Sequence, residues 1–119
     1  FLLLKCSMEK KDDVLRRRTL EVAQVWCENV FVTYTDRNHQ KWVTNYLLHS
    51  LENVSVLGPE DDLVPILVKG VTARLQSSWD DVRRDGMRIA EQTATRLGHS
   101  LKFDELEEER AMQSNSAIA

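Results

Sequence analysis

The stretch that decides the fold reads Leu75-Gln76-Ser77-Ser78-Trp79-Asp80-Asp81-Val82-Arg83-Arg84-Asp85-Gly86-Met87-Arg88-Ile89-Ala90-Glu91. Apolar residues recur at helical spacing before the polar break at Ser77-Ser78, and a second helical stripe follows it. Asp80 and Asp81 then fall in a first turn, where their charge faces the positive end of the helix dipole. The pattern predicts two antiparallel helices and the turn between them. The stripes are Leu63, Leu67, Val71 and Leu75, then Val82, Gly86, Ile89 or Ala90, Thr93 and Leu97.

Working outward, the chain is expected to hold about four helices, over residues 10–32, 37–52, 59–76 and 79–97. Gly98 is a natural left-handed cap for the last of these. Only four Gly and two Pro occur among 119 residues, and 42% of the residues are hydrophobic. This low content of helix breakers favours an all-α fold over a sandwich or barrel.

Particular residues are expected to fix the packing of these helices. Gly70 and Gly86 lie inside helical segments, where glycine is unfavourable, so each indicates a close approach of a neighbouring helix. The three tryptophans, Trp26, Trp42 and Trp79, are interpreted as core anchors on three different helices. The inner face of the second helix is predicted to be Val43, Tyr46, Leu47 and Leu51.

The chain changes character after Gly98. Residues 104–109 are almost all acidic, and residues 112–119 are mostly small and polar. We therefore predict a helical segment over residues 1–103 and the start of an acidic, polar linker over residues 104–119.

Asp80-Asp81-Val82-Arg83 opening a helix, with the small Gly86 four positions after the valine, is typical of a HEAT-like helical repeat. The predicted architecture is a segment of such a repeat, or α-solenoid. At 119 residues there is room for two to three repeats of about 40 to 47 residues each. Helical repeats present surfaces that hold other proteins.

A set of motifs in fixed order also resembles a known family. The set is Ser77-Ser78, Val82-Arg83-Arg84, Gly86-Met87, Ala90-Glu91 and Leu101-Lys102-Phe103 before the acidic run. Together they resemble the telomere length regulation protein family, densely over residues 68–109 and more loosely over residues 22–51. Asp85 departs from the pattern, which would have an apolar or neutral residue there.

The resemblance implies that this segment closes an N-terminal helical solenoid, just before an acidic linker. It further implies a non-catalytic scaffold in a three-protein complex with two other helical-repeat subunits. That complex delivers newly made phosphatidylinositol-3-kinase-related kinases to the heat-shock chaperone machinery, which is engaged through the downstream linker. Telomere maintenance, DNA-damage signalling and nutrient signalling depend on those kinases. The implied location is cytoplasmic and nuclear.

No motif of an enzyme or cofactor site is present, so we expect no catalytic residue, metal or cofactor. His39, His49 and His99 lack the spacing of a zinc site, and no phosphate-binding glycine loop occurs. Cys27 follows Trp26 in an apolar helix, so a buried reduced thiol is expected. No run approaches the roughly 20 apolar residues of a membrane span.

Arginines cluster in two places, at Arg16-Arg17-Arg18 and at Arg83, Arg84 and Arg88, although the net charge is −3. Arg83, Arg84 and Arg88 are the candidates for exposed contacts with a partner. The alternative is a solvated helix face on which arginines pair with neighbours such as Asp12, Asp13 and Asp80. Two other functions stay open: a generic HEAT or armadillo adaptor, and weak nucleic-acid binding that would collapse with salt.

Overall fold

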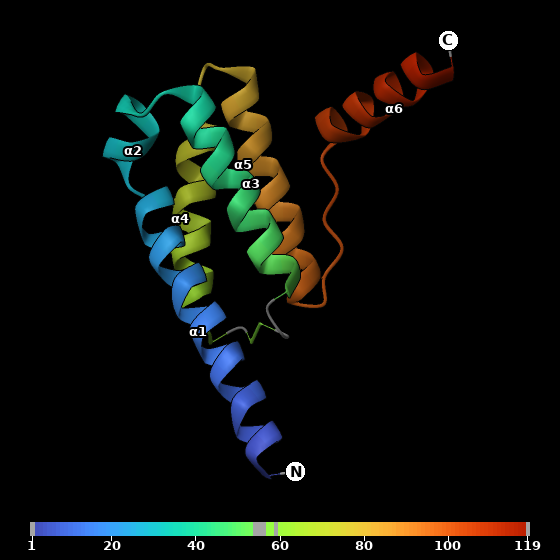
Figure 1. Ribbon diagram of the computed structural model, residues 1–119. Helices are drawn as coiled ribbons and strands as arrows, with labels where there is room; N and C mark the ends of the chain where they lie inside the picture. Colours follow the sequence, from blue (N-terminus) through green and yellow to red (C-terminus); the bar gives the residue numbers. More distant parts are fainter. Residues whose placement is uncertain (1, 54–56, 59, 119) are drawn as a thin grey trace.

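The computed structural model describes residues 2–53, 57–58 and 60–118, which form six helices and no strand (Figure 1). The helices are α1 (Leu2–Trp26), α2 (Asn29–Tyr34), α3 (Arg37–Asn53), α4 (Leu63–Leu75), α5 (Asp80–Arg96) and α6 (Asp104–Ile118). The predicted all-α class is confirmed.

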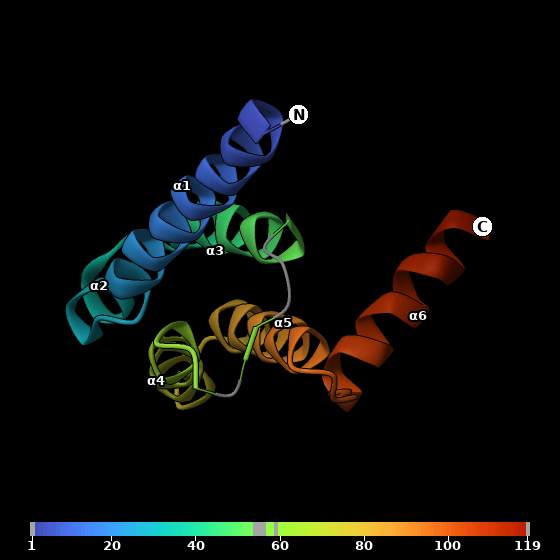
Figure 2. The ribbon, with the colours of Figure 1, turned by 90° about the horizontal axis from the view of Figure 1, so that it is seen from below.

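Four of these helices form two stacked antiparallel pairs. α1 is antiparallel to α3, and α4 is antiparallel to α5 (Figure 1). Viewed from below, the first pair lies on the second, with α1 packed against α4 and α3 packed against α5 (Figure 2). Because both pairs have the same direction and order, they are two successive units of a helical repeat. This is the predicted solenoid arrangement.

The first predicted helix, over residues 10–32, is wrong in extent. α1 begins at Leu2 and ends at Trp26, and residues 29–34 form the separate short helix α2. Glu28 between them has extended backbone (φ −70°, ψ 134°), so the chain bends there. The bend lets the partly buried Phe31 pack against the core. The second prediction, residues 37–52, matches α3 to within one residue.

The helix predicted from residue 59 begins later, at Leu63 of α4. The Asp61 carboxylate accepts a hydrogen bond from the Leu63 N–H at 3.1 Å, which satisfies one of the free donors of the first turn. Pro59 lies outside the described residues. Pro65 is the third residue of α4, a first-turn position at which proline is tolerated because its missing N–H has no partner within the helix.

The end of α5 is as predicted. Gly98 has φ +84°, in the left-handed region that favours glycine. The His99 N–H donates to the Ala94 carbonyl at 2.8 Å, and the Gly98 N–H donates to the Thr95 carbonyl at 3.1 Å. These two bonds form a Schellman cap, which turns the chain sharply out of the helix.

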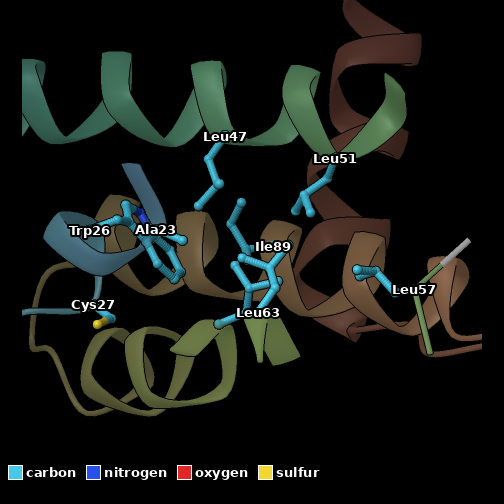
Figure 3. Close-up of a cluster of buried hydrophobic side chains, with 9 residues drawn as sticks. Ala23, Trp26, Cys27, Leu47, Leu51, Leu57, Leu63 and Ile89 are labelled. Carbon is cyan, nitrogen blue, oxygen red and sulfur yellow. The ribbon is translucent and has the colours of Figure 1, made fainter. Parts of the chain in front are cut away.

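The core lies between the two helix pairs and includes Trp26, whose side chain is fully buried (Figure 3). Its indole N–H donates to Thr44 Oγ1 at 2.9 Å, so its polar atom is satisfied. The guanidinium of Arg74 lies 3.8 Å from the ring centroid and donates to the Trp26 carbonyl at 2.7 Å. Burial lowers the pKa of Arg74 to about 10, because desolvation penalises its charge. The apolar members of the core cluster are Ala23, Trp26, Cys27, Leu47, Leu51, Leu57, Leu63, Leu67 and Ile89.

Both predicted close-packing glycines are confirmed. Gly70 of α4 lies directly against the Trp26 ring, so a Cβ there would overlap ring atoms. Gly86 of α5 lies against α4, where a Cβ would be 2.9 Å from the Cβ of Arg74. The absence of side chains at these two positions therefore sets how closely α4 approaches its neighbours.

Of the three tryptophans, only Trp26 is a core anchor. Trp42 is 66% exposed and Trp79 is 57% exposed, so the prediction for these two was wrong. Trp42 lies on the outer side of α3, whereas Trp79 precedes α5 and stacks beneath the guanidinium of Arg37 at 4.2 Å.

The predicted inner face of α3 is partly correct. Leu47 and Leu51 are buried, while Tyr46 is 40% exposed. Gln40, which was not predicted to face inward, is buried, and its side-chain amide donates to the carbonyls of Val32 and Thr35. A polar residue is stable there because it satisfies the free carbonyls at the end of α2.

The acidic segment expected to be a linker is helical over residues 104–118 and leaves the bundle at an angle (Figures 1 and 2). Asp104, Glu105 and Glu107 lie in its first turn, where the helix dipole favours negative charge. Leu106 is 2% exposed and anchors this end of α6. The division at residue 103/104 remains a prediction. No helix among the described residues is long and apolar enough to span a membrane.

Candidate protein-binding surface

The three candidate arginines lie along the side of α5 that faces α6, and they are only partly exposed. Arg83 donates to Asp80 at 2.8 Å and to Glu105 of α6 at 3.2 Å. These hydrogen bonds raise the pKa of Arg83. Its side chain is 25% exposed. The pairing with Asp80, which was the alternative to a partner contact, is therefore present, and Arg83 is less exposed than expected.

Arg88 is held from two sides. It donates to Asp85 at 2.9 Å within α5, and it reaches both carboxylate oxygens of Glu109 in α6 at 2.8 and 3.0 Å. This forked contact is the strong geometry for an arginine and a carboxylate. Arg84 lies nearby, with its Nε 3.9 Å from Glu109 and its side chain 38% exposed. We call Arg83, Arg84 and Arg88 the arginine row.

Asp85, the residue that departs from the family pattern, is buried beneath this row with 4% exposure. Burial raises its pKa, while the positive charges of Arg88, Lys41 and Arg74 oppose that rise. The family pattern has an apolar or neutral residue at this position. Burial likewise favours the neutral form of Asp85 over the charged one.

A second set of polar contacts fixes the start of α6. Glu91 is 8% exposed and accepts hydrogen bonds from the Phe103 N–H at 2.9 Å and from Arg110 at 3.0 Å. The hydrogen bond with Glu91 raises the pKa of Arg110. One buried carboxylate of α5 therefore ties down both the connecting loop and the first two turns of α6.

A surface that the sequence did not single out lies on the outer side of α1 and α3. It is a groove of about 380 Å³ lined by Glu21, Val22, Val25, Trp42, Val43 and Tyr46. Val25 is 54% exposed, and the Trp42 ring stacks on His39 and Tyr46 at centroid distances of 6.4 and 6.2 Å. Exposed apolar patches of this kind mark protein contacts. The signal was present as aromatic residues at helical spacing, but it was interpreted as core.

The described residues contain no group of three or more His, Cys, Asp or Glu side chains that could hold a metal ion. Arg16, from the other arginine cluster, forms an ion pair with Asp61 and does not join the row. The side chains of Asp12 and Asp13, considered as partners of that cluster, lie outside the described residues.

Comparison with known proteins identifies the repeat. No solved structure matches the chain. The family model described as the TELO2 ARM repeat domain matches residues 4–105, which includes both stacked helix pairs and ends in the first turn of α6. The match spans both regions in which the motifs resemble the family, although it stops short of the last four residues of the denser one. Because it covers most of the chain, the chain belongs to the TELO2 ARM repeat domain family and is a segment of a telomere length regulation protein.

Proposed function

We propose that this chain is a non-catalytic scaffold segment of a co-chaperone-type adaptor for phosphatidylinositol-3-kinase-related kinases. The observation that carries the proposal is the family match over residues 4–105, on a helical-repeat fold. Helical repeats bind large partners along their surfaces and perform no turnover in doing so.

The proposed partners are two other helical-repeat subunits and the kinases themselves, with the heat-shock chaperone machinery recruited downstream. The proposed setting is the cytoplasm and nucleus. The arginine row and the groove beside Trp42 support a binding role, because charged and aromatic side chains supply much of the energy of protein contacts. Loss of the scaffold would lower the abundance of the kinases, and with it telomere maintenance and DNA-damage and nutrient signalling.

Direct binding of telomeric DNA is the weaker alternative. Phosphate contacts need free cations, whereas Arg83 and Arg88 already contact carboxylates of α6. A generic HEAT or armadillo adaptor with unrelated partners is the other alternative.

The test is an affinity pull-down of the full-length parent protein with identification of its partners by mass spectrometry. Recovery of very large kinases with two helical-repeat proteins is the expected result. A matched pull-down with the parent carrying Arg83→Glu and Arg84→Glu asks whether the arginine row contributes. Recovery of unrelated cargo alone, in repeated experiments, would reject the kinase role and leave an adaptor of another kind.

A further inference from the structure

The arginine row already holds a ligand, which is the acidic helix α6 of the same chain. Glu105 and Glu109 lie one turn apart on α6 and meet Arg83 and Arg88 on α5. Between them Leu106 is almost completely buried. The sequence pattern of α6 that contacts α5 is therefore Glu-Leu-x-x-Glu, with two carboxylates on either side of one buried apolar residue.

Apart from one apolar anchor, α6 is held by ion pairs, which include that of Arg110 with Glu91 of α5. Leu106 is the one buried side chain among the described side chains of α6, residues 104–112. The ion pairs are partly open to water: the Arg83 and Glu105 side chains are 25% and 42% exposed, and those of Arg88 and Glu109 are 27% and 26% exposed. Solvent-exposed ion pairs contribute little each, and salt weakens them further. A helix held in this way can be displaced.

We propose that the arginine row is a binding site for an acidic helix of a partner protein, and that α6 occupies this site until the partner displaces it. The proposal rests on the scaffold function above and names the chemistry of one partner segment: a helix with an apolar residue between two carboxylates one turn apart. Only molecules in which α6 is released can bind the partner, so the apparent affinity equals the intrinsic affinity multiplied by the released fraction.

The probe is a fluorescein-labelled peptide with the sequence of residues 103–112, titrated against the full chain and followed by fluorescence anisotropy. The release variant is Leu106→Ser with Glu109→Gln, which removes the anchor and the forked contact. The control is Glu107→Gln with Ala111→Ser, which also removes one carboxylate and introduces one serine, at two exposed positions of α6 outside the cleft beside Arg83 and Arg84. Hydrogen exchange over residues 104–112 reports whether α6 has left α5.

The expected result is peptide binding at least about tenfold tighter to the release variant than to the wild type, with the control unchanged. Adding Arg83→Gln and Arg88→Gln, which removes the two arginines that contact Glu105 and Glu109, to the release variant should abolish that gain. The proposal is overturned if α6 is released and the affinity does not rise, if the gain survives without the arginines, or if hydrogen exchange shows that α6 stays seated. Exchange of α6 between two wild-type copies, seen as a dimer by sedimentation, would assign the site to a second copy instead.

These outcomes are separable from the pull-down. Peptide exchange without recovery of kinases rejects the named partners and keeps the acidic-helix site. Recovery of kinases without peptide exchange keeps the scaffold function and removes the acidic helix as its ligand.

Discussion

Among the glycines, Gly70 is the position where an added methyl group should reduce the free energy of unfolding most. In an exposed helix, Gly→Ala gains about 1 kcal/mol from helix propensity alone. Here the new Cβ would overlap the ring of the fully buried Trp26 and lie 3.2 Å from the Cα of Cys27. The ring cannot swing aside, because its N–H is bonded to Thr44 and its face is covered by Arg74.

Overpacking a tight core costs typically about 1–3 kcal/mol. The overlap with a fixed aromatic ring places Gly70→Ala at the upper end, so the net loss after the propensity gain is about 2 kcal/mol. For a domain of this size the melting temperature should fall by about 5–10 °C.

The assay is urea unfolding of the full chain, followed by circular dichroism at the helix band. The matched control is Gly58→Ala, since a Cβ at Gly58 meets nothing within 4 Å and its φ is outside the left-handed region. That variant should be neutral or slightly stabilising. If Gly70→Ala is as stable as the wild type while Gly58→Ala behaves as expected, the close contact with Trp26 does not govern the packing of α4.

Three further predictions use the same unfolding measurement or the pull-down. Trp26→Ala should lose about 3–5 kcal/mol of stability, while Trp42→Ala, at a side chain 66% exposed, should lose less than about 1 kcal/mol; equal losses would contradict the assignment of a single core tryptophan. Asp85 has a raised pKa in the folded chain, so its stabilising contribution is present below its unfolded pKa and is lost as the pH rises through its folded pKa. Asp85→Asn should therefore remove part of the change in unfolding free energy between about pH 4 and pH 7, and an unchanged pH profile would refute this. Arg83→Glu with Arg84→Glu should weaken capture of partners by the parent protein and keep the helical circular dichroism signal, whereas loss of the helical signal would mean that the row is structural.

The sequence predicts best where local chemistry and packing agree. The turn before α5, the end of α5 at Gly98 and the contact at Gly86 each depend on one or two residues with a specific backbone or steric role. Predictions of this kind hold in the folded chain because they do not depend on a partner that is distant in the sequence.

What the sequence could not show depends on partners that are distant along the chain. Arg74 occupies a core position because Trp26, 48 residues earlier, offers both a ring face and a carbonyl. Trp42 and Trp79 are large aromatic residues of the kind expected in a core, but both are exposed. Residues 104–118 look like a linker because the sequence alone does not reveal that Arg83 and Arg88 would balance their charge.

The indole of Trp26 joins elements that a repeat protein would otherwise keep independent. It belongs to α1, bonds to α3 and is enclosed by Gly70 and Arg74 of α4, so both helix pairs share one side chain. Repeat arrays can melt unit by unit when the interface between neighbours is weak. Here neither pair can melt without withdrawing a ring from the other, which couples the two units into a single cooperative transition. Since Trp42 and Trp79 are exposed, a change in the emission of Trp26 would report the melting of both pairs at once.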